Sequence, residues 1–216
     1  VVKPARGEQG RGITVGVQGF EAARQAIAVA RQFSDDVLVE EFVMGEDLRL
    51  VVIDFQLVAA AIRRPARIVG DGVTSAIDLI AAQSRRREAA TQGESRIPID
   101  AETERCLADA GLKLTDIPAR GQTVVVRRTA NLHTGGTLHD VTAEAHPTLV
   151  EAAVAAARAI DIPVTGIDLM VEAADKPFYR FIEANERPGL ANHEPQPTAE
   201  RFVDMLFPLS AARRHN

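Results

Sequence analysis

The chain has 216 residues, of which 46% are hydrophobic and 25% charged, enough for one large domain or two modest lobes with a real core. Its net charge of −5 and low aromatic content of 4%, with no Trp, argue against a nucleic-acid partner. No apolar run approaches the roughly 20 residues that cross a bilayer, so we expect no membrane partner. Cys106 is the single cysteine, which excludes an internal disulfide and fits a reducing, cytoplasmic location.

The first 44 residues predict part of a smaller lobe. Short apolar runs predict strands at residues 1–3, 13–17 and 37–43, with a glycine-rich turn at residues 5–12. Apolar residues at helical spacing predict an amphipathic helix over residues 20–33, whose apolar face is formed by Phe20, Ala23, Ile27 and Ala30. Gly45 then interrupts the pattern, so we place the boundary between two lobes after residue 44.

Residues 45–216 predict a larger lobe of mixed composition. Strands are expected at residues 48–54, 57–62, 123–128, 165–171 and 178–184. Helices are expected at residues 76–90, 102–110, 148–160 and 199–206, and a polar loop at residues 91–99. The mixture, with mostly hairpin-type connections, indicates the α+β class.

The last two expected strands carry a pair of acids. The residues between them form a turn, so the strands should pair as a hairpin with Asp168 roughly opposite Glu183. Side chains alternate along a strand, so Glu183 and Asn185 share a face. Opposed like charges destabilise a sheet, which predicts a positive group between them. Two carboxylates and an amide oxygen suit Mg²⁺; the alternative is a solvated hairpin face, which the apolar flanking residues disfavour.

A second feature is the glycine-rich segment Gly7-Glu8-Gln9-Gly10-Arg11-Gly12. An apolar, strand-like run follows it, so it differs from the dinucleotide and Walker loops, which lead into a helix. Such a loop can lie over phosphates and offer backbone N–H groups, and Lys3 just before it can add a positive charge. Alone, the segment is more simply explained as a flexible turn with a surface lysine, but beside a metal pair it favours phosphate binding.

These segments, in this order, resemble the signature of the ATP-grasp ligases across essentially the whole chain. The resemblance implies a partial ATP-grasp fold, with part of the small nucleotide lobe followed by the large C-terminal lobe, and implies ATP and Mg²⁺ as cofactors. It assigns the phosphates to Lys3, Gly10 and Gly12, and the adenine edge to Glu40, Glu41 and Val43. It assigns the ribose to Asp47, and the metal to Asp168, Glu183 and Asn185. Without the resemblance, Glu40 and Glu41 would be an exposed strand edge and Asp47 a turn residue.

Residues 59–66, 69–72 and 127–136 resemble, more narrowly, the ATP-grasp region of cyanophycin synthetases and bifunctional glutathione synthetases. In that group an arginine and an asparagine face the reacting phosphoryl group. Arg127 and Asn131 fit this spacing, with Arg128 as the alternative, and Arg63 is the other candidate clamp. The structural alternative for these arginines is a solvated surface, which we expect for Arg128 because neighbours on a strand point to opposite faces.

The segment from Glu183 to Pro195, together with an ending shortly after Phe207-Pro208, resembles the C-terminal part of N-acetylglutaminylglutamine synthetases. The resemblance implies a ligase that converts a substrate carboxylate to an acyl phosphate, which an amine then attacks to form an amide. A ligase with a cyanophycin- or glutathione-type substrate pair is the second hypothesis, and a non-catalytic nucleotide-binding fragment is the third.

The resemblance also places a second lysine and an N-terminal substrate lobe upstream of residue 1. We therefore expect that this chain alone has little ligase activity, that an N-terminal region of the same polypeptide is its partner, and that an apolar surface left without that lobe could form a homodimer.

Overall fold

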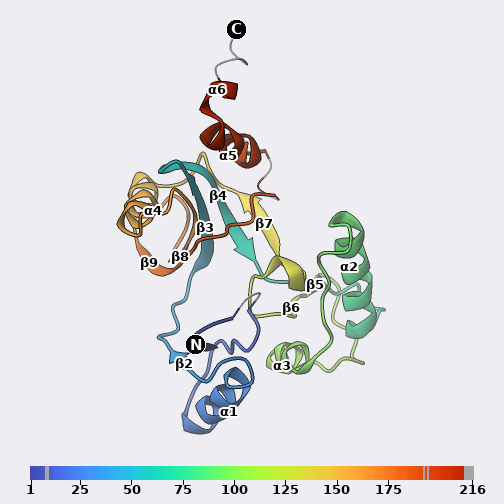
Figure 1. The fold of residues 1–216 in the computed structure, drawn as a ribbon. Helices are drawn as coiled ribbons and strands as arrows, with labels where there is room; N and C mark the ends of the chain where they lie inside the picture. Colours follow the sequence, from blue (N-terminus) through green and yellow to red (C-terminus); the bar gives the residue numbers. More distant parts are fainter. Residues whose placement is uncertain (8–9, 192, 194, 212–216) are drawn as a thin grey trace. The chain divides into compact units, whose positions relative to one another are not determined.

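The computed structural model describes residues 1–7, 10–191, 193 and 195–211. They form two compact units (Figure 1): unit 1 is Val1–Phe42 with Pro65–Thr137, and unit 2 is Val43–Arg64 with Leu138–Asn216. The second unit begins close to the boundary expected after residue 44, but residues 65–137 group with the N-terminal segment. The assignment of residues 1–44 and 45–216 to two ATP-grasp lobes stays a prediction.

Unit 2 is built on a five-stranded sheet with the order β7-β4-β3-β8-β9. The β3–β4 hairpin turns at Asp54 and Phe55, whose φ angles of 53° and 55° are those of a tight hairpin turn. The five strands are Thr137–Asp140 (β7), Gln56–Arg64 (β4), Glu46–Ile53 (β3), Val164–Val171 (β8) and Tyr179–Asn185 (β9).

One face of this sheet carries the main core of unit 2. Helix α4, Pro147–Ala159, packs its small and apolar residues Leu149, Ala153 and Ala157 against β3, β4 and β8. On the other face, Val51 and Ile53 pack with residues of helix α5, Thr198–Leu206, and the short helix α6, Pro208–Ala211, follows. Between α5 and the far end of β3, this second face is polar.

Unit 1 contains two small antiparallel sheets and two cores. In the first, β1 (Val2–Pro4) pairs with β2 (Val37–Val39), and helix α1 (Phe20–Ala30) buries Ala26 and Ala30 with Val2. The second core lies around the β5–β6 pair. Its elements are β5 (Arg67–Val69), α2 (Ala76–Ala90), α3 (Ala101–Asp109) and β6 (Thr123–Val125), and the 3₁₀ turn η1 (Leu132–Thr134) follows β6 along the chain.

Several predicted elements differ from the structure. The strand expected at residues 13–17 is wrong: Thr14 forms a single bridge with Val2, and Gly16 and Gly19 have φ angles of 68° and 81°, which no regular strand contains. The strand expected at residues 37–43 ends at Val39. Phe20 is 84% exposed, so the apolar face expected for the first helix is also wrong at that residue. No helix among the described residues has the length and apolar character needed to cross a membrane.

Candidate active site

The polar face of the unit 2 sheet brings together the three residues expected to bind metal. Asp168 on β8 is the register partner of Glu183 on β9, which confirms the predicted hairpin register. The register shifts directly after Asp168, and the two strands are paired on both sides of this shift. Asn185 lies two residues beyond Glu183 and donates its side-chain amide to Glu183 Oε1 at 3.1 Å, so the two share a face.

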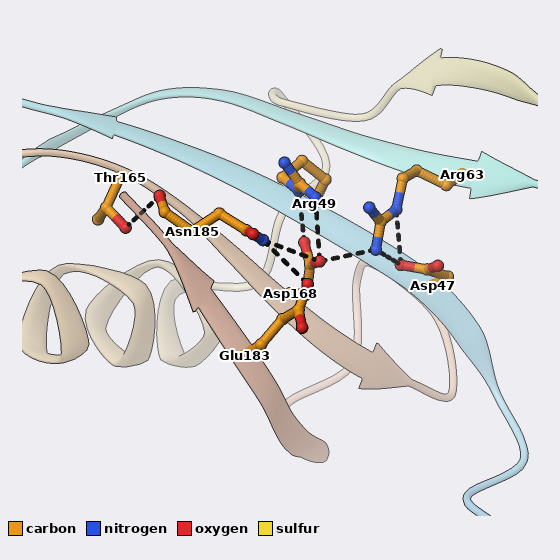
Figure 2. Close-up of polar contacts among 7 residues, drawn as sticks. All are labelled: Asp47, Arg49, Arg63, Thr165, Asp168, Glu183 and Asn185. Atoms are coloured by element: carbon orange, nitrogen blue, oxygen red, sulfur yellow. Dashed lines mark hydrogen bonds and ion pairs between the residues drawn. The ribbon is translucent and has the colours of Figure 1, made fainter. Parts of the chain in front are cut away.

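Two arginines supply positive charge on this face (Figure 2). On β3, the strand on the other side of β8 from β9, Arg49 is the register partner of Asp168. It donates hydrogen bonds to both carboxylate oxygens, with Nη2 3.0 Å from Oδ2. Arg63 on β4 places its Nη2 2.9 Å from the same Oδ2. The Asp168 side chain is 3% exposed, and these contacts satisfy a buried carboxylate that would otherwise be costly.

Asp47 completes the charged network at the Arg63 end. Its Oδ1 accepts from Arg63 Nε at 2.9 Å and from Nη2 at 2.7 Å. Burial raises the pKa of Asp47 despite the attraction of Arg63. Burial tends to lower the pKa of Arg63, but the charges of Asp168 and Asp47 outweigh it and raise that pKa overall. The network thus holds the Arg63 guanidinium in place between two carboxylates, and Asp47, which was expected to bind the ribose, instead pairs with the candidate clamp Arg63.

The donor set on this face fits Mg²⁺. The Asn185 amide nitrogen lies 3.4 Å from Asp168 Oδ2 as well as near Glu183, so both acids converge on one small region. A carboxylate has about four acceptor positions, and the arginines leave Asp168 and Glu183 with some of them. A half-turn of the Asn185 amide would present its oxygen to a cation. Among the described residues, no group of three His, Cys, Asp or Glu side chains is placed to hold a metal ion. Mg²⁺ is usually bound by one or two carboxylates, with water and phosphate oxygens in its other positions.

The candidate nucleotide residues of unit 1 lie on β1, beside β2 and in the glycine loop. Lys3 and Glu40 form an ion pair with 2.8 Å between Nζ and Oε2. Gly12 has a φ of 74°, and a Cβ added there would lie 2.6 Å from the Phe33 ring, so only glycine fits. Gly10, with a φ of 72°, lies beside the Asn131 side chain. Residues 8 and 9 of the loop lie outside the described residues. Glu41 is exposed, and Val43 is half-buried at the start of unit 2.

Arg127 and Arg128 both form ion pairs within unit 1. The Arg127 side chain is 8% exposed, with Nη1 2.6 Å from Asp100 and Nη2 2.7 Å from Glu102. Arg128, expected to be solvated, pairs with Asp109 at 2.5 Å and donates to the Val15 carbonyl at 3.4 Å. The Arg128 side chain stays 32% exposed, so it is partly solvated as well as paired with an acid of α3.

The remaining candidate clamp residue of unit 1 is Asn131. Its Oδ1 accepts from the His133 backbone N–H at 2.8 Å, which caps the 3₁₀ turn that begins at the next residue.

Sequence reasoning missed Arg49 and the burial of His193. The signal for Arg49 was its alternation with Asp47 at the start of a strand that is apolar from Leu50 onward, which places both charges on one face. His193 is 7% exposed, a backbone hydrogen bond joins its ring to Gly189, and Nδ1 has no hydrogen-bond partner in the described part of the chain. Burial, followed by the charge of Arg49, lowers its pKa.

Curated proteins of similar sequence are ligases. The chain is 34% identical over 221 residues to the cyanophycin synthetase of Nostoc sp., a match that covers 96% of this chain and 24% of that protein. It is 30% identical over 226 residues to the glutathione biosynthesis bifunctional protein GshAB of Pasteurella multocida, covering 96% of this chain and 30% of that protein. The chain thus spans 24% to 30% of the length of these two relatives. No family model matches it.

Two solved structures of ligases resemble the chain in fold. The bifunctional glutathione synthetase of Pasteurella multocida superimposes with a TM-score of 0.62 at 29% identity, over 96% of this chain and 30% of that one. The D-alanine–D-alanine ligase of Bacillus anthracis gives a TM-score of 0.52 at 14% identity, over 100% of this chain and 56% of that one, a likeness of fold alone. The chain therefore has part of the ATP-grasp fold, a mixed α and β architecture with an antiparallel five-stranded sheet.

Proposed function

We propose that this chain is the ATP-grasp part of an ATP-dependent carboxylate–amine ligase that forms an amide bond through an acyl phosphate. The observation that carries the proposal is the convergence of Asp168, Glu183 and Asn185 beside two arginines on one sheet face. An oxygen-rich set flanked by guanidinium groups suits a magnesium-bound polyphosphate, since metal and arginine both neutralise phosphate charge.

In the proposed reaction, the chain's own residues position the reacting groups and neutralise the charge of the phosphates. Mg²⁺, when bound, would neutralise negative charge on the phosphate oxygens as the bond between the γ-phosphorus and its leaving oxygen breaks. Arg63, held in place by Asp47 and Asp168, would stabilise the oxyanions as charge moves during phosphoryl transfer, and Arg127 with Asn131 would serve the same step. Lys3, Gly10 and Gly12 would hold the phosphates, with Glu40, Glu41, Val43 and Asp47 on adenine and ribose. The glycine loop would exclude water, which would otherwise hydrolyse the acyl phosphate.

For the substrates, we propose an N-acetylglutamine-type carboxylate and a glutamine-type amine, the pair joined by N-acetylglutaminylglutamine synthetases. Support for this pair comes from the resemblance of residues 183–195 and of the chain's last segment to those enzymes. The names of the relatives favour, as a second candidate, a cyanophycin- or glutathione-type pair. We further propose that an N-terminal region of a longer polypeptide supplies the substrate lobe, since the chain spans 24–30% of these relatives.

The test is calorimetric titration of Mg-ADP, and of Mg²⁺ with a non-hydrolysable ATP analogue, into the chain. We expect magnesium-dependent binding that Glu183→Gln and Asp168→Asn each weaken, whereas Glu172→Gln, an exposed acid just past β8, leaves it unchanged. Equal binding by all four proteins would contradict the proposed metal site. Binding by the wild type would justify assaying amide formation from N-acetylglutamine and glutamine on the longer protein, and the second candidate would gain if only other substrate pairs reacted.

A further inference from the structure

The contact between Arg49 and Asp168 is bidentate. Nε and Nη2 of the guanidinium donate to Oδ1 and Oδ2, respectively, across the β3–β8 pair. Both side chains are shielded, at 16% and 3% exposure. A paired contact of this kind fixes the plane of the carboxylate as well as its position, because the planar fork has one matching orientation.

Gly166 leaves the space in which Arg49 lies. It precedes Asp168 by two residues on β8, so both belong to the same sheet face. A Cβ added at Gly166 would lie 3.0 Å from Arg49 Nη1, 3.3 Å from its Cδ and 3.2 Å from Pro188 Cβ. The φ of Gly166 lies outside the left-handed region, so the glycine serves space and not backbone conformation. Pro188 closes the other side of this slot.

We propose that Arg49 is a positioning residue for Asp168 and that Gly166 leaves the slot for the Arg49 guanidinium, which a methyl group at this position would displace by a few tenths of an ångström. The inference rests on the proposed function, since Asp168 is oriented there for a divalent cation. Oδ2 also accepts from Arg63 and, at 3.4 Å, from the Asn185 amide, so the Arg49 guanidinium orients the carboxylate oxygen that lies toward Asn185. Gly166 is also the register partner of Asn185, which makes the slot continuous with the candidate ligands.

The experiment compares Gly166→Ala and Arg49→Lys with Gly189→Ala, a matched control in which the added methyl group meets no atom of the other described residues within 4 Å, its two chain neighbours aside. The first readout is Mn²⁺ affinity, measured by electron paramagnetic resonance with the metal alone. Loss of an outer partner of a metal ligand typically weakens binding about 10- to 100-fold, and we expect such a loss in Gly166→Ala and Arg49→Lys but not in Gly189→Ala. Arg49→Lys keeps the positive charge and leaves the slot open. It therefore tests the bidentate contact with Asp168 even if Gly166→Ala folds poorly.

The second readout needs no metal. In a spectrum of ¹⁵N-labelled arginine side chains, we expect a resolved Arg49 Nε–H signal in the wild type that is displaced or lost in Gly166→Ala and retained in Gly189→Ala. Wild-type Mn²⁺ affinity in Gly166→Ala and Arg49→Lys would overturn the positioning role while leaving the proposed function intact. A wild type that binds no Mn²⁺ would count against the metal site itself, and an unchanged Arg49 signal in Gly166→Ala would overturn the slot.

Discussion

Asp168 and Glu183 face each other on neighbouring strands, and the side-chain amide of Asn185 donates to both carboxylates. The two acids nevertheless have different surroundings. Asp168 is buried and held by two arginines, whereas Glu183 is exposed at the edge strand of the sheet. Asp168 therefore contributes to the stability of the fold as well as to the candidate site, whereas Glu183 contributes mainly to the site.

This difference predicts different effects on stability. Asp168→Asn removes the charge shared by Arg49 and Arg63 and leaves two shielded guanidinium groups undercompensated, which should lower the free energy of unfolding by about 3 kcal/mol. Glu183→Gln should change it by less than about 0.5 kcal/mol. Urea unfolding followed by circular dichroism measures both, and equal losses would contradict the environments described. Glu183→Gln is therefore the cleaner variant for nucleotide titration.

Arg127 should also matter for stability, apart from any role at the reacting phosphate. Arg127→Met leaves Asp100 and Glu102 without their main cation, and charged hydrogen bonds of this kind contribute about 1.5–3 kcal/mol, so we expect a loss near 2 kcal/mol because Asp100 is partly exposed. Arg105→Met, at an exposed position on the same helix α3, is the control and should be neutral. An unchanged stability of Arg127→Met would mean that these ion pairs contribute little, and would favour a role on substrate alone.

His193 predicts a dependence of stability on pH. Burial, then the charges of Arg49 and Arg63, lower the pKa of its ring below the ordinary 6.5, while Asp140 acts in the opposite direction. Below pH 6.5 the unfolded chain therefore takes up a proton that the folded chain does not, and stability falls as the pH falls toward the folded-state pKa. His193→Gln should flatten this part of the stability curve. The same slope in both proteins between pH 6.5 and 5, an interval of about 1.5 units, would contradict the shift.

Elements with a local signal could be predicted from the sequence. Helix α2 spans Ala76–Ala90 as expected, because Ser75 caps it and accepts from the Asp78 N–H. The β8–β9 hairpin was predictable because its turn and the alternation of its strands fix the register, and the register placed Asp168 opposite Glu183.

Features that depend on distant segments could not be predicted in this way. The burial of Arg127 depends on acids of α3 that lie some 25 residues earlier, and the pairing of Arg49 with Asp168 spans 119 residues. Strands β5 and β7 were missed because each has only 3 or 4 residues, too few for a periodic pattern. The division of residues 65–137 from the unit 2 sheet likewise follows from packing that no local pattern shows.

Cys106 offers a last prediction, on reactivity. The thiol is 5% exposed on α3, and burial together with the negative charge of Glu102 raises its pKa. Since the thiolate is the nucleophile, the folded protein should react slowly with a thiol reagent at neutral pH, and the rate should rise sharply once guanidinium unfolds the chain. Cys106→Ser, with no other cysteine in the chain, provides the blank for the assay. Equal labelling rates in the folded and unfolded protein would show that α3 opens readily, because the barrier to labelling is the opening of this core.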